Sequence, residues 1–156
     1  MTTAANAVDV LEIALGMERI GRDFYGVLAL ASDDAKVRDF CFRAARDEGN
    51  HLTAFQRLRQ RFAASASAAP GQAPTGVTNA WITLTKKHIQ PDARRASQIA
   101  LGGDIHAAID MAIQMEQDAI VFYESLLAQM PGSAAVLQAI IGEERHHVSS
   151  LYLLVP

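Results

Sequence analysis

The sequence predicts an all-α protein, a four-helix bundle built from two helical hairpins that a long connection joins. Three observations support this prediction: four long segments have helical periodicity, short breaks join them in pairs, and the two pairs resemble each other in sequence. The 156 residues can bury a sizeable core, so we assign residues 1–156 to a single domain.

The periodic segments and the breaks between them give the expected helices. They cover about residues 6–31, 33–63, 104–129 and 133–154. Ser32 can cap the second helix, which opens on acidic residues. Gly102 and Gly103 precede the third helix, and the break "PGS" ends it and leaves Ser133 to cap the fourth.

Residues 64–103 form the long connection. A Pro/Gly-rich run of small residues at 63–77 is expected to be flexible, and the segment 79–90 can form a short helix that ends before Pro91. The short breaks make the helices of each pair antiparallel neighbours, so the long connection carries the chain back along the bundle. A four-helix bundle with one such crossover is the ferritin-like arrangement.

The two halves of the chain look like two copies of one helical hairpin. A shift of 98 residues superimposes the first expected helix on the third, and a shift of 96 residues superimposes the second on the fourth. The polar residues that coincide are the pairs Glu18/Glu116, Tyr25/Tyr123, Glu48/Glu144 and His51/His147. We therefore expect a bundle with approximate two-fold symmetry.

Four glutamates and two histidines lie on the helix faces that the apolar residues define. Unpaired carboxylates are costly in a core, and these faces offer no matching lysine or arginine. Two divalent ions would supply the missing charge, and carboxylates with imidazoles suit iron or manganese. A glutamate from each of two helices with a Glu-x-x-His from each of the others is the di-iron carboxylate pattern. The candidate ligands are Glu18, Glu48, His51, Glu116, Glu144 and His147.

Two interpretations of neighbouring residues stay open at this point. Tyr25 and Tyr123 are either core aromatics whose hydroxyl finds a partner, or phenols that hydrogen-bond the ligand carboxylates and quench one-electron oxidants. The candidate ligands also have a non-functional interpretation, in which the charged residues of the bundle are solvated and two core histidines have hydrogen-bond partners.

Glu143 and His146 have the same three-residue spacing as the candidate ligand pairs. In the repeat they align with Asp47 and Asn50, and an asparagine is a poor replacement for a ligand histidine. We therefore expect Glu143 and His146 to be solvated neighbours of the ligand set or to contact it from outside.

The stretches "MERIGRDFY", "RDEGNH", "MEQDAIVFY" and "EERHH" resemble the rubrerythrin family of the ferritin-like superfamily, over about residues 6–62 and 104–154. In that family such residues bind a di-iron site that reduces hydrogen peroxide. The resemblance implies three kinds of metal ligand: terminal carboxylates from Glu18 and Glu116, bridging carboxylates from Glu48 and Glu144, and one histidine for each ion, His51 and His147.

Two features depart from full-length rubrerythrins. Cys41 is the only cysteine, so the four-cysteine rubredoxin-like tail is missing, and electrons would come from an external donor such as a rubredoxin-like protein. Ile113 and Ala119 stand one turn from Glu116, where rubrerythrins proper carry an additional carboxylate. The six-ligand site that results is closer to the site of bacterioferritins.

The resemblance implies a di-iron oxidoreductase that reduces hydrogen peroxide or dioxygen, with two iron ions and with manganese or zinc as alternative metals. The competing functions are a ferroxidase or iron-storage protein of the bacterioferritin type, and a non-catalytic metal-binding bundle. No fifth helix follows residue 154 to help build a storage cage, so we expect a homodimer, with outer residues such as Val27 and Leu30 available for the partner.

Composition narrows the partners and the compartment. The formal net charge of −3 offers no broad basic field to a nucleic acid, and no apolar run reaches the roughly 18–20 residues of a membrane span. The N-terminal residues lack the pattern of a secretory signal, and a single cysteine excludes a disulfide framework within one chain. We therefore expect a cytoplasmic protein without nucleic-acid or membrane partners.

Overall fold

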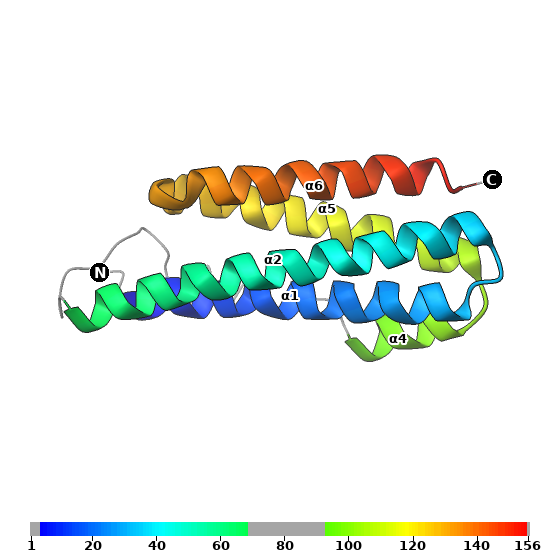
Figure 1. Ribbon diagram of the computed structural model, residues 1–156, viewed down its shortest axis with the longest axis horizontal. Coiled ribbons are helices and arrows are strands. Elements are labelled where there is room, and N and C mark those ends of the chain that lie inside the picture. Colours follow the sequence, from blue (N-terminus) through cyan, green and yellow to red (C-terminus); the bar gives the residue numbers. More distant parts are fainter. Residues whose placement is uncertain (1–3, 69–92, 156) are drawn as a thin grey trace.

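The computed structural model describes residues 4–68 and 93–155, and the structural statements that follow concern these residues. The prediction of an all-α protein is confirmed, because every regular element in this part of the chain is a helix (Figure 1). The elements are α1 (Ala4–Ala31), α2 (Ala35–Ala68), α4 (Ala93–Leu101), α5 (Ile105–Gln129), the 3₁₀ turn η1 (Pro131–Ser133) and α6 (Ala134–Tyr152).

Each long helix lies where the periodicity predicts it, although some ends differ. Helix α2 continues to Ala68, beyond the predicted end at 63, because its last turns are rich in alanine, the strongest helix former. Helix α6 ends at Tyr152, short of the predicted end at 154.

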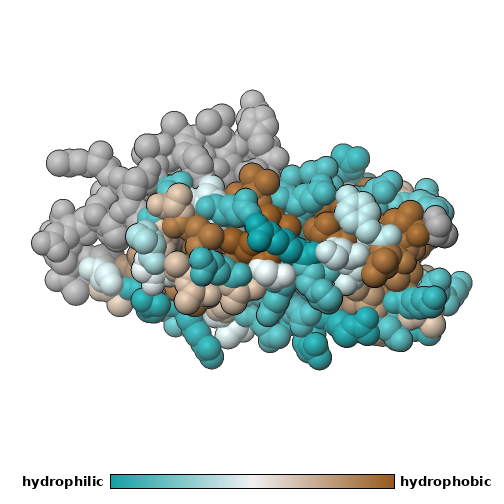
Figure 2. All heavy atoms as spheres, turned by 90° about the horizontal axis from the view of Figure 1, so that it is seen from above, coloured by the Kyte–Doolittle hydropathy of each residue, from teal (hydrophilic) through white to brown (hydrophobic). Residues whose placement is uncertain are grey.

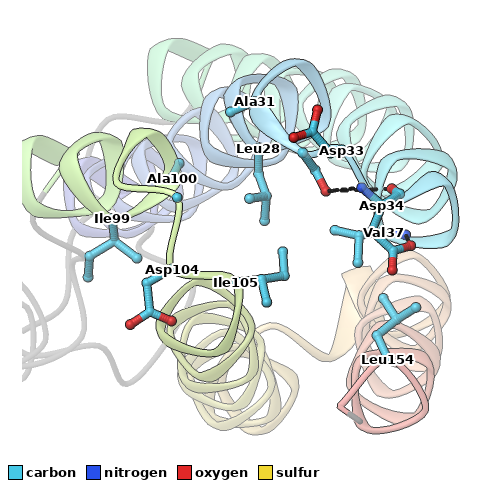
Figure 3. A pocket seen from close by; sticks show the side chains of 12 residues that line it. Leu28, Ala31, Asp33, Asp34, Val37, Ile99, Ala100, Asp104, Ile105 and Leu154 are labelled. Carbon is cyan, nitrogen blue, oxygen red and sulfur yellow. Dashed lines mark hydrogen bonds between the residues drawn. The ribbon is translucent and has the colours of Figure 1, made fainter.

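Asp34, and not Ser32, caps the start of α2. Its Oδ1 atom accepts the backbone N–H groups of Lys36 at 2.8 Å and Val37 at 3.1 Å. Ser32 Oγ instead accepts the N–H of Asp34 at 3.2 Å, so it shapes the turn before the helix (Figure 3). Aspartate and serine are about equally good caps, so the sequence alone could not choose between these neighbouring positions.

The third long helix has a side-chain cap that was not predicted, and the predicted cap of the fourth is wrong. Asp104 accepts the N–H of Ala107 at 3.1 Å at the start of α5. Ser133 makes no capping hydrogen bond with its side chain. It ends the turn η1, which leads directly into α6 and already satisfies backbone groups at that end.

Helix α4 lies within the long connection 64–103, beyond the run 63–77 that was expected to be flexible, and the sequence analysis did not predict it. The helix is nine residues long, and its buried residues Ala96 and Ala100 are small, so it buries little apolar surface. The helix packs mainly against α1, with a smaller contact on α5. The predicted short helix at 79–90 lies outside the described residues.

The four long helices form two antiparallel hairpins, α1 with α2 and α5 with α6 (Figure 1). Helix α5 contacts α1 and runs antiparallel to it, and α6 has the same relation to α2. Helices α2 and α5 run in the same direction, so α2 ends at the opposite end of the bundle from the start of α5.

The bundle core consists of two apolar clusters with a polar layer between them. The first cluster gathers the start of α1, the second half of α2 and the parts of α5 and α6 that adjoin η1. The second gathers the opposite ends of the same helices together with α4. Residues at heptad-like spacing form one seam on α1 and one on α5, and both seams are buried: Leu11, Ala14, Glu18, Gly21, Tyr25 and Leu28 on α1, and Ile109, Ala112, Glu116, Ala119, Tyr123 and Leu126 on α5.

The outer surface is mixed in polarity, with hydrophobic side chains over the end of the molecule where α6 finishes (Figure 2). Leu153 and Val155 are exposed there. Leu30 is exposed too, whereas Val27 packs partly against the second core cluster. Among the described residues no single helix is long and apolar enough to cross a membrane, although α5 and the η1–α6 segment pass that test together as a pair bent by 119°.

Candidate metal centre

The six predicted ligand residues meet in the polar layer of the core. Helices α1 and α5 each contribute one glutamate, and α2 and α6 each contribute a glutamate and a histidine three residues later. On every helix these residues lie between the positions that belong to the two apolar clusters. The exposed fractions are at most 4 % for the set Glu18, Glu48, His51, Glu116, Glu144 and His147.

The donor atoms of these residues form two groups of four, and within each group all of them lie within 4.8 Å of one another. Each group contains three carboxylates and one imidazole. One group is Glu18, Glu48, His51 and Glu144, and the other is Glu48, Glu116, Glu144 and His147. Glu48 and Glu144 belong to both groups, which is the position that a bridging carboxylate requires.

Both histidines turn their Nδ1 atoms toward the carboxylates. His51 Nδ1 lies 3.1 Å from Glu144 Oε1 and 3.3 Å from Glu18 Oε2. His147 Nδ1 lies 3.0 Å from Glu144 Oε2 and 3.3 Å from Glu116 Oε1. Glu144 therefore contacts both imidazoles, whereas Glu18 contacts the ring of His51 and Glu116 contacts the ring of His147.

The Nε2 atoms of the same rings face outward, toward two carboxylates outside the ligand set. His51 Nε2 lies 2.6 Å from Glu143 Oε2, and His147 Nε2 lies 3.5 Å from Asp47 Oδ2. With the ring proton on Nε2, His51 donates to Glu143 and leaves the Nδ1 lone pair facing the interior. The repeat already aligned Glu143 with Asp47, but it gave no sign that each carboxylate reaches the histidine of the other hairpin.

The two tyrosines hydrogen-bond Glu116 and Glu18 across the bundle. The Tyr25 hydroxyl on α1 donates to Glu116 Oε1 on α5, and the Tyr123 hydroxyl on α5 donates to Glu18 Oε1 on α1. Both phenols are buried. The hydrogen bonds therefore orient the carboxylates and connect the two hairpins in the same place.

Burial and mutual repulsion raise the pKa values of two of these carboxyl groups, whereas the two histidines lower the pKa of a third. Burial, followed by the charges of Glu18 and Glu144, holds the pKa of Glu48 well above its usual range. Burial and the charge of Glu144 raise the pKa of Glu116 to about 8, although His147 opposes this. Burial also acts to raise the pKa of Glu144, but the hydrogen bond with His147 and the close contact with His51 outweigh it and lower this pKa to about 2.

The histidines respond to the same carboxylates. Burial acts to lower the pKa of His147, but hydrogen bonds to Glu116 and Glu144 outweigh it and raise this pKa to about 10. The nearby carboxylates of Glu144 and Glu18 likewise raise the pKa of His51 against the effect of burial. Without metal, Glu116 and His147 therefore retain their protons at neutral pH, and these protons occupy places that cations could take.

This donor set fits two divalent metal ions. In the described part of the chain, the ion pairs of the four glutamates are made with His51 and His147 and with no lysine or arginine. Glu18 Oε2 and His51 Nδ1 are buried without a hydrogen-bond partner, although they lie 3.3 Å apart. The charges of four carboxylates balance those of two divalent cations. In addition, two buried atoms of one donor group lack a hydrogen-bond partner, as is expected of a ligand set without its metal.

A small cavity of about 20 Å³ opens beside the carboxylates, between α1 and α5. This volume is about that of one water-sized molecule. Gly21 lies in its wall, and a Cβ atom at that position would lie 3.3 Å from both Cδ and Oε2 of Glu48. The absence of a side chain at Gly21 therefore leaves room for the carboxylate of Glu48, which belongs to both donor groups.

The remaining candidates fall outside the site. His146 is exposed, in agreement with its exclusion from the ligand set. Cys41 is a buried residue of the second core cluster, where burial raises the pKa of its thiol to about 12. Searches against family models, curated proteins and solved structures find no match to this chain.

Proposed function

We propose that this protein is a ferritin-like, rubrerythrin-like di-iron oxidoreductase that reduces hydrogen peroxide or dioxygen with electrons from an external donor. The observation that carries the proposal is the pair of four-residue donor groups that share Glu48 and Glu144. Helices α2 and α5 run in the same direction, so a crossover connection must join the two hairpins. This topology supports the ferritin-like part of the proposal.

In this proposal, Glu18 and Glu116 are terminal ligands, Glu48 and Glu144 bridge the two ions, and His51 and His147 bind one ion each. Two ferrous ions held there would supply the two electrons that, with two protons, reduce one hydrogen peroxide to two waters. The glutamates balance the charge of the metals, and the tyrosine hydroxyls keep the terminal carboxylates in place.

The protein would then need an external donor, because Cys41 is the only cysteine and cannot form a four-cysteine iron site. A small redox protein such as a rubredoxin-like donor would fill this role. We also propose a cytoplasmic homodimer, for which Leu30 is one exposed apolar contact residue.

A ferroxidase or iron-storage function of the bacterioferritin type is the second candidate. It is favoured by the absence of a fifth carboxylate one turn from Glu116, where Ile113 and Ala119 are buried apolar residues. In that case iron would be a substrate that passes through the site, and the protein would oxidise many ions per chain.

Anaerobic loading with Fe²⁺ followed by peroxide titration tests the proposal. We expect two ions per chain, one peroxide consumed per loaded chain, and repeated turnover when a reductant is supplied. The variants Glu48→Ala and Glu144→Ala should lose all three properties, and His146→Ala, which changes an exposed neighbour, should retain them. Oxidation of many irons per chain without repeated peroxide turnover would favour storage, and a redox-silent metal complex would contradict both functions.

A further inference from the structure

The small cavity at the glutamates is lined by two methionines that are equivalent in the repeat. Met17 on α1 and Met115 on α5 lie in its wall together with Gly21 and Ala119, opposite the carboxylates. Met17 is 5 % exposed, and Met115 is half-buried against the second core cluster. Of the two, Met115 is the more accessible from outside, and Met17 belongs to the first core cluster.

Met115 also lines a much larger groove on the surface. This groove lies between α4 and α5, has a volume of about 450 Å³, and includes Ile99 of α4 and the polar residues Asp110, Gln114 and Asp118 of α5. Met115 is the residue that the linings of the surface groove and of the cavity at the carboxylates have in common. Helix α4, which the sequence did not predict, forms one wall of this groove.

Methionine is suited to such a position because its unbranched thioether has three rotatable bonds and adjusts to small changes in shape. A cavity of about 20 Å³ holds one water-sized molecule, so a two-oxygen molecule needs only a modest shift of a methionine. A tert-butyl group adds four carbon atoms, for which this cavity has no room.

We propose that Met115, with Met17, determines which oxidants reach the carboxylates: hydrogen peroxide and dioxygen pass from the α4/α5 groove, whereas organic hydroperoxides are excluded. This inference rests on the proposed function for the identity of the oxidants, but the size limit is a property of the chain itself. It assigns a specificity-determining role to two residues that are not metal ligands.

The test compares wild type with Met115→Ala, Met17→Ala and the matched control Met111→Ala. Met111 lines the outer groove and does not line the inner cavity. The Fe²⁺-loaded proteins are mixed with hydrogen peroxide or tert-butyl hydroperoxide, and the oxidation rates are compared. We expect Met115→Ala to raise the ratio of the tert-butyl hydroperoxide rate to the hydrogen peroxide rate by about tenfold or more, with a smaller rise for Met17→Ala and none for Met111→Ala.

A second readout does not depend on redox activity. The Co²⁺-loaded proteins are titrated with azide, a slender three-atom anion, and with benzoate, and the visible absorption of the cobalt is recorded. Azide should change the spectrum of every variant, whereas benzoate should change it only when Met115 or Met17 is truncated.

Benzoate binding to the wild type, or equal behaviour of the Met115→Ala and Met111→Ala variants, would overturn the inference. Selective azide binding without any reaction of the Fe²⁺-loaded protein with peroxide would support the size limit and contradict the proposed oxidoreductase function. A chain that binds neither iron nor cobalt would overturn both.

Discussion

His51 Nε2 lies 2.6 Å from Glu143 Oε2, while the Nδ1 atom of the same ring faces Glu18 and Glu144 in the core. Glu143 is half exposed, with 56 % of its side-chain surface accessible, so a solvent-accessible carboxylate orients a buried imidazole. His147 has the same relation to Asp47 at the longer distance of 3.5 Å. The two-fold repeat therefore extends beyond the ligands to the groups that orient them.

Removal of these outer carboxylates should weaken metal binding without abolishing it. We expect Glu143→Ala to lower the affinity for Co²⁺ by about 10- to 100-fold, because the carboxylate fixes the tautomer and raises the basicity of the ligand. Asp47→Ala should have a smaller effect, since its contact is longer. Competition titration with a chelator measures both affinities. Glu124→Ala, which removes an exposed carboxylate paired with Arg145, is the control and should leave the affinity unchanged.

The stability of the metal-free protein should fall as the pH rises from about 5 to 8. The pKa of Glu116 is raised from 4.5 to about 8 in the folded state, so the stability it contributes is present below pH 4.5 and is lost as the pH rises through 8. The raised pKa of His147, about 10 against an ordinary 6.5, acts in the same direction from pH 6.5 upward.

Glu144 opposes this trend only in acid, because its lowered pKa of about 2 removes stability as the pH falls below 4.5. Thermal unfolding in a chelator at several pH values measures the dependence, and Glu116→Gln should flatten it. A midpoint that is constant or rises between pH 5 and 8 would show that the carboxyl groups are not packed together as described.

Glu48→Gln should stabilise the metal-free protein and impair the metal-bound one. Burial and the charges of Glu18 and Glu144 disfavour the Glu48 carboxylate, and a neutral amide of the same size removes that repulsion. We expect a gain of about 1–2 kcal/mol in the free energy of unfolding without metal, within the range of stabilising single substitutions. The same variant should bind at most one metal ion tightly, since an amide is a poor bridge between cations. Thermal unfolding with and without Co²⁺ measures both effects, and a loss of stability in the metal-free state would contradict the repulsion.

Gly21→Ala and Gly26→Ala should have opposite consequences although both lie on α1. A Cβ at Gly21 would lie 3.3 Å from Glu48 Cδ, so the carboxylate must shift. We therefore expect Gly21→Ala to bind metal more weakly and to oxidise bound Fe²⁺ more slowly. A Cβ at Gly26 meets no atom within 4 Å, so alanine should stabilise the helix by roughly 0.5–1 kcal/mol and leave the site intact. Equal metal affinities in the two variants would show that Glu48 does not depend on the space at Gly21.

The sequence was informative where a polar residue interrupts an apolar seam. Glu18 and Glu116 stand at seam positions whose other members are buried, so period and register together placed them in the core. The repeat between the halves then strengthened the case for His51 and His147, because a chance motif would not recur at the equivalent position.

Contacts that depend on the distance between elements were not predictable in this way. The cap at Asp34 and the contact of Glu143 with His51 are set by a local turn and by the approach of α6 to α2. Helix α4 was missed because Ala96 and Ala100 bury little surface, and its position is set by packing on α1. The sequence therefore also did not predict that α4 forms one wall of the groove that Met115 lines.

The number of metal ions bound per chain tests the central claim most directly. Anaerobic titration with Fe²⁺ or Co²⁺, followed by gel filtration and metal analysis, should give two ions per chain for the wild type and for His146→Ala, and at most one for His147→Ala. His147 is buried with Nδ1 facing Glu116 and Glu144, whereas its neighbour is exposed. No stoichiometric metal in the wild type, or a loss of metal in His146→Ala with retention in His147→Ala, would contradict the assignment of the site.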